Sequence, residues 1–240
     1  TMHLHTAPVS VDVFITTYGE PIEIIRQTVA AAVAMHGRHS TFVLDDVRSD
    51  VVRDVAAELG AGYLRRTTNE GAKAGNINHA LAETTGDLFV IFDADFVPQP
   101  NFLHETIPFF ADQEVAFVQT PQHYGNLSSL ISRGAGYMQS VFYGLIQPGK
   151  NRFNAAFCVG TNVVFRRRAI AEIGRIYQAS KSDDGWTAIL RHEQGWTNGY
   201  IPTVLATGAP PETSEDYAEH PERRRTRGTR HTPRATPCHR

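Results

Sequence analysis

The sequence predicts an α/β protein built on a Rossmann-type, mostly parallel sheet flanked by helices. The first observation is the unbroken apolar run LFVIF at residues 88–92, because a strand this hydrophobic must be buried on both faces. The second is that strand-like and helix-like segments alternate, which is typical of right-handed crossovers between parallel strands. The third is that polar residues directly follow the strands, where open α/β folds bind ligands.

Apolar patterns locate the individual elements. Residues 11–15 are expected to form the first strand. A helix should follow, because Pro21 suits its first turn and apolar residues recur at helical spacing from Ile22 to Val33. Further strands are expected at residues 41–44, 62–65, 88–92, 115–119 and 163–165. Further helices are expected at residues 50–59, at 126–147 as one helix or a pair, and at 169–173, with a loop entering a helix at 73–82.

Three acidic clusters stand out: Asp45-Asp46, Asp93-x-Asp95 and Asp183-Asp184. Neighbouring carboxylates repel one another unless a hard cation such as Mg²⁺ or Mn²⁺ neutralises them, and such a cation is often shared with substrate phosphates. Because Asp93 and Asp95 follow the apolar strand at 88–92, they predict a metal and nucleotide site at the carboxyl edge of the sheet. A helix-capping aspartate beside a solvated one would explain the same pair, so the motif alone leaves both interpretations open.

Absent motifs disfavour several common classes of enzyme. No G-x-G-x-x-G follows the first strand, as a dinucleotide-binding dehydrogenase would require, and no Walker A motif marks a P-loop NTPase. The nucleophile elbow G-x-S-x-G of many hydrolases is also missing. The first strand instead leads into Thr16-Thr17-Tyr18-Gly19-Glu20-Pro21, whose hydroxyl and carboxylate groups suit hydrogen bonds to a base and a ribose.

Charge is distributed unevenly along the chain. Residues 221–240 hold seven arginines and one acid, so residues 1–220 hold 16 basic and 24 acidic side chains, although the net charge of the whole is −2. Residues 1–217 are expected to form one domain, and 218–240 a basic, disordered tail. Nucleic-acid binding would rest on this tail alone and is not expected.

No feature of the sequence indicates membrane insertion or a disulfide framework. No run approaches the roughly 18 consecutive apolar residues of a transmembrane helix, and the first residues do not resemble a signal peptide. The two cysteines, Cys158 and Cys238, also lack the spacing of a zinc site. Taken alone, the chain is expected to be a soluble cytoplasmic polypeptide.

A series of short motifs extends over residues 10–217. In order, they are Thr16 to Pro21; Leu44-Asp45-Asp46; Lys73-Ala74-Gly75-Asn76 with Asn78; Phe92-Asp93-Ala94-Asp95; Val118-Gln119-Thr120-Pro121; Phe142-Tyr143-Gly144 with Ile146-Gln147; Asn154-Ala155, Phe157-Cys158 and Gly160-Thr161-Asn162; and Ser182-Asp183-Asp184. Each is weak alone, but their order and spacing resemble a family 2 glycosyltransferase of the cellulose-synthase-like branch. The resemblance implies a GT-A-like fold, a UDP-sugar donor, Mg²⁺ or Mn²⁺, and inverting transfer of a sugar, expected to be glucose, to a growing β-glycan.

The resemblance also implies roles for particular residues. Nucleotide contacts fall to Thr16, Tyr18, Glu20, Asp45, Asp46, Lys73 and Asp93, with Asp45 and Asp46 holding the uracil and ribose and Lys73 approaching the pyrophosphate. Asp95, with Asp93, would ligate the cation that stabilises the departing UDP as a Lewis acid. Asp184 would be the general base that deprotonates the acceptor hydroxyl. The acceptor site would be lined by Cys158, Gly160 and Thr161.

Ordinary structural roles would explain several of these residues as well. The pair Asp45-Asp46 on its own suits a turn, and Asp183-Asp184 suits a helix cap. A lysine such as Lys73 in a glycine-rich loop is usually solvated, and Cys158 suits a small buried apolar position. The sequence of each motif therefore leaves its structural and functional interpretations open.

Two departures from the family pattern bear on activity. Val47 stands where the family usually has glycine after its acidic pair, and a β-branched residue is costly there if the position needs a positive φ. The family's Q-x-x-R-W segment, whose Trp stacks on the acceptor sugar, is replaced after Tyr217 by an arginine-rich sequence. The hypothesis of a frame change or truncation there is tested by sequencing the codons for residues 215–225.

These departures leave three functional interpretations. The first is a sugar-transferring domain that works with a glycan acceptor and the membrane-embedded parts of a parent synthase, at the cytoplasmic face of the plasma membrane. The second is a UDP-binding fragment that is catalytically incompetent. The third is a non-processive glycosyltransferase, for which the missing Trp matters less.

Overall fold

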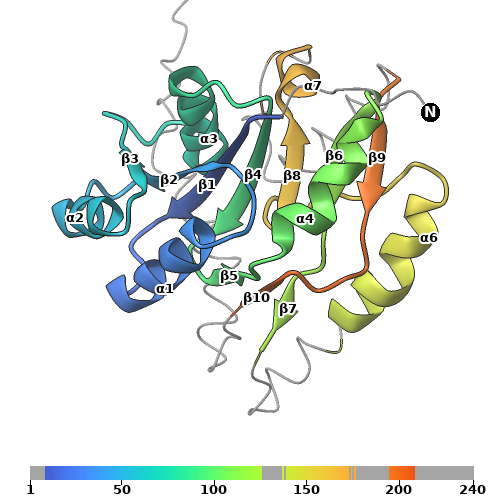
Figure 1. The fold of residues 1–240 in the computed structure, drawn as a ribbon, viewed down its shortest axis with the longest axis horizontal. Coiled ribbons are helices and arrows are strands. Elements are labelled where there is room, and N and C mark those ends of the chain that lie inside the picture. Colours follow the sequence, from blue (N-terminus) through green and yellow to red (C-terminus); the bar gives the residue numbers. More distant parts are fainter. Residues whose placement is uncertain are drawn as a thin grey trace, which may run out of the picture.

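A seven-stranded sheet organises the chain in the computed structural model, which describes residues 9–125, 137, 139–172, 174, 176 and 195–208 (Figure 1). Its strand order is β3-β2-β1-β4-β8-β6-β9. The strands are β1 Val11–Thr17, β2 Ser40–Asp45, β3 Gly62–Leu64, β4 Leu88–Asp93, β6 Val115–Gln119, β8 Val163–Arg166 and β9 Thr197–Tyr200. All neighbouring pairs are parallel except those of β8, which runs antiparallel to β4 and β6. The expected mostly parallel sheet is therefore confirmed.

Helices cover both faces of this sheet. They are α1 Ile22–Val33, α2 Asp50–Glu58, α3 Ala72–Glu83, α4 Phe102–Thr106, the 3₁₀ turn η1 Ile107–Ala111, the π-helical turn η2 Phe142–Ile146, α6 Gln147–Asn151 and α7 Arg167–Glu172. One core layer joins the sheet to α1, α2 and α4, of which α1 and α4 lie on the near side of the sheet in Figure 1. The other layer joins the sheet to α3 and α7.

The central strand β4 shows why residues 88–92 are apolar without alternation. Val90 and Phe92 belong to the core layer beneath α1, whereas Phe89 and Ile91 belong to the layer beneath α3. All four side chains are buried, because helices cover both faces. Burial on both sides fixes the position of β4 and, with it, the position of the residues that follow.

A small second sheet lies next to the exit of β4. It contains β5 Phe96–Pro98, β10 Ala206–Gly208 and β7 His123–Tyr124, in the order β5-β10-β7. Pairing is antiparallel between β5 and β10 and parallel between β10 and β7. These strands have only two or three residues each, too few for a recognisable alternation of apolar and polar side chains, and the sequence analysis did not predict them.

Two other expectations need correction. The segment at 73–82 is helical throughout, because α3 begins at Ala72, so the loop lies entirely before Lys73. The helical stretch expected to end at 147 continues through α6 to Asn151, while residues 126–136 and 138 lie outside the described part of the chain. Asp183, Asp184 and the tail at 218–240 also lie outside it, so the expected domain boundary stays a prediction.

Candidate functional site

The carboxyl ends of β1, β2 and β4 meet at one edge of the sheet. In the register of the sheet, Thr16 lies beside Asp93 of β4, and Thr17 lies beside Asp45 of β2. The sheet therefore brings together the polar residues that follow three separate strands. This is the edge at which open α/β sheets bind ligands.

Asp93 is the centre of a polar cluster at this edge. Its Oδ1 accepts a hydrogen bond of 3.0 Å from the Thr16 hydroxyl and contacts the Lys73 ammonium group. Lys73 also donates to the Gly160 carbonyl at 2.7 Å, and the Asp93 amide donates to the Thr161 hydroxyl at 2.9 Å. Five of the residues implied by the family resemblance thus share one hydrogen-bonded cluster. Lys73 is about one-third exposed, so its charge remains accessible to a ligand.

Asp95 has a partly buried carboxyl group close to two other acidic residues. Burial raises the pKa of its carboxyl group to about 7, and the negative charges of Asp93 and Glu20 act in the same direction. A divalent cation beside Asp95 would offset both effects, so the residues present fit such an ion. No group of three His, Cys, Asp or Glu side chains that could hold a metal occurs within the described residues. Two carboxylates completed by substrate phosphates and water are, however, a usual Mg²⁺ environment.

The loop after β1 forms one side of the same edge. The Tyr18 amide donates to Glu20 Oε2 at 2.6 Å, which closes a tight turn. Tyr18 is 37% exposed, so part of its side chain is accessible at this edge. Thr16 contacts Asp93, and Glu20 lies close enough to raise the pKa of Asp95. The nucleotide contacts expected of Thr16, Tyr18 and Glu20 stay predictions.

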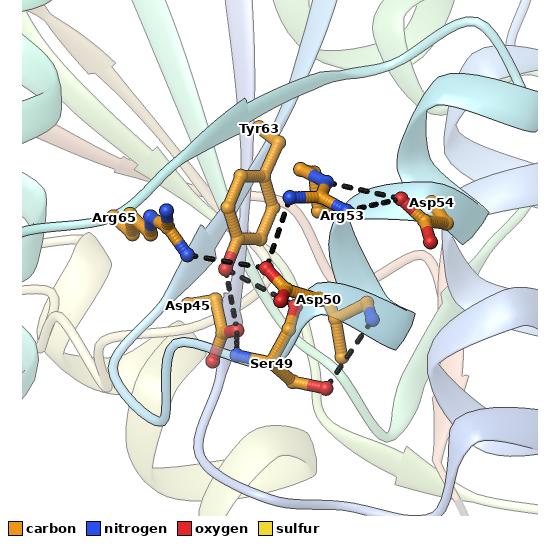
Figure 2. Close-up of polar contacts among 8 residues, drawn as sticks. Asp45, Ser49, Asp50, Arg53, Asp54, Tyr63 and Arg65 are labelled. Atoms are coloured by element: carbon orange, nitrogen blue, oxygen red, sulfur yellow. Dashed lines mark hydrogen bonds and ion pairs between the residues drawn. The ribbon is translucent and has the colours of Figure 1, made fainter.

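Asp45 is buried, and its hydrogen bonds shape the loop that follows β2. Its Oδ1 accepts from the Val47 amide at 2.8 Å, and its Oδ2 accepts from the Ser49 amide at 2.6 Å and the Tyr63 hydroxyl at 2.9 Å. Figure 2 shows the Tyr63 hydroxyl directed at Asp45 from β3. Burial, together with this bond, raises the pKa of Tyr63 to about 12. The carboxylate of Asp45 therefore already has a structural function.

An outer group of charges surrounds Tyr63 in Figure 2. Arg53 pairs with Asp50 and Asp54, and Arg65 pairs with Asp50. All four side chains are close to half exposed or more. Pairs this exposed contribute little to stability because water screens them.

Asp46 pairs with a residue that the sequence analysis missed. Arg66 donates from Nε to Asp46 Oδ1 at 2.8 Å and from Nη2 to Asp46 Oδ2 at 3.0 Å. The side chains of Asp46 and Arg66 are only 3% and 9% exposed. Nothing in the local sequence separates Arg66 from the exposed Arg65 beside it, so only the folded structure identifies this partner.

Gln119 is a second residue of the site that was not assigned a role. It is fully buried in β6, where its Nε2 donates to the Thr161 carbonyl at 2.8 Å and its Oε1 accepts from the Val159 amide at 2.9 Å. These bonds fix the loop at 158–162, which supplies the Gly160 carbonyl to Lys73. Cys158, in the same loop, is buried and forms no disulfide within the described residues. Its predicted contact with an acceptor stays a prediction.

The backbone after Asp46 does not have the strain suspected at Val47. The residue with positive φ is Arg48, at 63°, and Val47 is not among the described residues with positive φ. Val47 is 50% exposed and lies against Gly19, with its Cγ2 3.6 Å from the position that a Cβ would occupy there. The valine therefore fits this loop without a distorted backbone.

Ala72, the first residue of α3, has a φ of 44°, which is unfavourable for an alanine. We expect Ala72→Gly to stabilise the protein by about 1 kcal/mol, because glycine adopts this conformation without steric cost. Urea denaturation measures the change. The same substitution at exposed Ala82 of α3 should instead destabilise by about 1 kcal/mol, because there the backbone is ordinary helix. Loss of stability at both positions would contradict the assigned strain.

No helix in the described part of the chain is long and apolar enough to cross a membrane.

The family model "Glycosyl transferase family 2" matches residues 12–174. "Putative cellulose synthase 2" of Komagataeibacter xylinus is 38% identical over 208 residues, which cover 83% of this chain and 14% of that protein. "Cellulose synthase catalytic subunit [UDP-forming]" of Xanthomonas axonopodis pv. citri (strain 306) is 37% identical over 83% of this chain and 28% of that protein. The chain thus spans less than a third of the length of these relatives.

Two solved structures show the same fold at low sequence identity. The mannosyltransferase PcManGT from Pyrobaculum calidifontis, in complex with GDP-Man and Mn²⁺, has a TM-score of 0.69 and 21% identity, over 95% of this chain and 66% of that one. Glucosyl-3-phosphoglycerate synthase from Mycobacterium tuberculosis, in complex with Mn²⁺, UDP and glucosyl-3-phosphoglycerate, has a TM-score of 0.60 and 15% identity, over 90% and 76% of the two chains. Both comparisons support the GT-A-like α/β arrangement of the sheet and its helices.

Proposed function

Because this chain belongs to glycosyltransferase family 2, we propose that the edge formed by β1, β2 and β4 binds a UDP-sugar and a divalent cation. We propose further that the reaction is inverting transfer of glucose from UDP-glucose to a growing β-glycan. The observation that carries this proposal is the cluster of Thr16, Lys73 and Asp93, with the partly buried carboxyl group of Asp95 next to it. The relatives named as cellulose synthases support the choice of a glucan product.

Each donor-site residue has a defined task in this proposal. Lys73 supplies a positive charge to the pyrophosphate, and Asp93 holds Lys73 in place while it contacts the nucleotide. Mg²⁺ or Mn²⁺, held by Asp95 and Asp93, would stabilise the charge of the departing UDP. Thr16, Tyr18 and Glu20 border the nucleoside, and the loops shaped by Asp45 and Asp46 form the base and ribose pocket.

The acceptor side uses residues from two further segments. Asp184 takes the proton of the acceptor hydroxyl, which then attacks C1 of the sugar in line. Cys158, Gly160 and Thr161 belong to the loop that faces Lys73 and would line the path of the acceptor. The loop is held by Gln119, so its backbone is fixed before any ligand binds.

An exposed apolar surface supports a membrane partner within a longer protein. Tyr137, Leu145 and Phe153 are 71%, 71% and 78% exposed, and they lie in the segment that contains η2 and α6. Large apolar side chains exposed together are typical of contact surfaces. We propose that this segment faces the membrane-embedded parts of the parent synthase, with the domain on the cytoplasmic side.

UDP release from UDP-glucose tests the proposed transfer. With Mn²⁺ and a cello-oligosaccharide acceptor, Asp184→Asn should lower turnover by about 10²- to 10⁴-fold while leaving the Kd of UDP unchanged, because it removes only the general base. Asp183→Asn is the matched control and should keep most of the turnover. UDP binding without turnover in the wild-type chain would favour the incompetent fragment, and absence of UDP binding would refute the proposed function itself.

A further inference from the structure

Arg66 connects the exit of β2 to the start of α3. Besides its two bonds to Asp46, the guanidinium group donates to the Glu70 carbonyl from Nη1 and to the Ala72 carbonyl from Nη2, the latter at 2.6 Å. Asn69 adds a bond of 2.9 Å from its amide nitrogen to the Asp46 carbonyl. The loop at 66–72 is therefore attached to Asp46 at several points along its length. We refer to Arg66 and Asp46 with these contacts as the Arg66 clamp.

The loop at 66–72 needs such an attachment because its last residue, Ala72, has an unfavourable backbone conformation. Gly71 and Ala72 have consecutive positive φ values of 72° and 44°. No side chain caps the amino end of α3, so the helix does not fix its own starting point by the usual means. Positive-φ residues persist only where the surrounding structure determines them, and the clamp supplies those contacts.

Gly75 leaves the space that the Arg66 guanidinium group occupies. A Cβ atom at this position in α3 would collide with the Glu70 carbonyl oxygen and with Arg66 Nη1. The helix can begin here only because Gly75 has no side chain. The sequence K-A-G-N thus combines a charged residue directed at Asp93 with a glycine that admits Arg66.

Lys73 immediately follows the clamped loop. Its ammonium group reaches the Asp93 carboxylate, at the end of β4, and the Gly160 carbonyl, and β1 separates β4 from β2, the strand that precedes Asp46. A lysine side chain has a flexible four-carbon stem, so the position of its charge depends on where the backbone holds its Cα. A displacement of about 1 Å in a catalytic group can cost about 100-fold in rate.

We propose that Arg66 is a positioning residue that acts through Asp46 and the loop at 66–72 to hold Lys73 at the diphosphate of the bound nucleotide. This inference rests on the proposed UDP-sugar site and assigns separate tasks to two residues within it. Asp46 serves as the anchor of Arg66, and Lys73 supplies the contact with phosphate. Four of the five guanidinium N–H groups of Arg66 donate within the protein, so the proposal gives Arg66 no direct contact with the nucleotide.

Calorimetric titration with UDP and UMP, both with Mn²⁺, tests this role. Arg66→Lys should weaken UDP binding by about tenfold, the worth of one charge-assisted phosphate contact, because lysine cannot bind Asp46 through two parallel bonds and also reach two carbonyls. UMP binding should weaken clearly less than UDP binding, since UMP lacks the second phosphate that Lys73 contacts. In a Lys73→Met background, Arg66→Lys should have no further effect on the Kd of UDP.

Two further variants distinguish the positioning role of Arg66 from a general loss of folding. Arg65→Lys is the matched control and should leave both affinities unchanged, because Arg65 is 49% exposed and pairs with Asp50 instead. Asn69→Ala removes one attachment of the same loop without burying a new group, and it should weaken UDP binding in the same direction as Arg66→Lys.

The possible results separate this inference from the proposed function. If UDP and UMP weaken equally, or if the effects of Arg66→Lys and Lys73→Met simply add, the positioning role is refuted although the nucleotide site stands. If the wild-type chain binds UDP and every Arg66 variant binds it equally well, the inference alone fails. If the wild-type chain binds neither nucleotide, the proposed function is refuted, and the inference, which depends on it, is refuted as well.

Discussion

Asp95→Asn is expected to abolish the Mn²⁺ dependence of UDP binding and, at the same time, to stabilise the metal-free protein at neutral pH. The first effect follows because an amide is a weaker ligand than a carboxylate for a hard cation, and losing a ligand should cost about 100-fold or more in metal affinity. The second follows because the carboxylate is held in a largely buried place beside Asp93 and Glu20. A neutral amide in the same place carries no such penalty.

The pH dependence of this stabilisation has a defined direction. The pKa of Asp95 is raised to about 7 in the folded protein, above the unfolded value of about 3.9. The folded state therefore binds the proton more tightly, so ionisation destabilises the protein as pH rises from about 4 to about 7, and the full penalty is present above that range. Asp95→Asn should consequently raise the urea midpoint at pH 8 in EDTA and change it little at pH 4.

Measuring Mn²⁺-dependent UDP binding and the urea midpoint on the same variant separates loss of a metal ligand from loss of folding. A variant that loses metal-dependent binding while gaining stability has not simply unfolded. Asp112→Asn is the control, because it removes the same charge from an exposed position after η1 and should alter neither the Kd nor the neutral-pH midpoint. Retention of Mn²⁺-dependent binding by Asp95→Asn would refute the assigned metal ligand, and a lower midpoint at pH 8 would refute the assigned repulsion.

The sequence predicted the central strands well, because their patterns are local. The run at 88–92 is apolar throughout because both faces of β4 are buried. An unbroken apolar run between polar residues was therefore interpreted as a buried strand. Strand β9 escaped prediction because Thr197–Tyr200 contains a glycine and an asparagine, and its place beside β6 is decided by tertiary packing. The reversed direction of β8 likewise has no local signal.

The candidate site divides in the same way. Asp93 could be singled out because it follows a recognisable apolar strand, whereas Lys73 was assigned through the family resemblance alone. The structure places the two side chains in contact, and their roles toward a nucleotide stay predictions. Gln119 could not be predicted, because its partners are backbone groups, which every residue possesses. Arg66 could not, because its charged partner Asp46 is distant in sequence and its other two partners are backbone carbonyl groups. Asp46 was predicted as a ligand of the nucleoside, whereas its carboxylate in the structure accepts both of its bonds from Arg66. Its contact with a nucleoside stays a prediction.

The opposite edge of the sheet contains a partly buried ion pair between Asp12 and Arg167. Asp12, at the start of β1, is 6% exposed and accepts from the Gly86 amide at 2.7 Å and from Arg167 Nη2 at 2.8 Å. Arg167 also donates to the carbonyls of Leu81, Thr84 and Gly86, and to the Thr84 hydroxyl. This ion pair thereby joins β1, the end of α3 and the start of α7.

Removing one member of this pair should destabilise the protein by about 3–5 kcal/mol, because the partner becomes an uncompensated charge in a poorly solvated place. We expect this for Asp12→Ala and for Arg167→Met, measured by urea denaturation. The Asp12→Ala/Arg167→Met double variant should lose less than the sum of the two, since no unpaired charge remains. Against a total stability of about 5–15 kcal/mol, either single change would be readily measurable.

Asp12→Asn provides the matched control for the Asp12–Arg167 pair. Its amide oxygen can still accept from the Gly86 amide, so the difference between Asp12→Asn and Asp12→Ala isolates that hydrogen bond from the charge. At temperatures where each variant is folded, UDP binding should match the wild type, because Asp12 lies at the amino end of β1 and the proposed donor site, with Thr16 and Asp93, lies at its carboxyl end. Strictly additive losses in the double variant would show that the two charges do not compensate each other, and the stability of this edge would then have to come from the apolar layers alone.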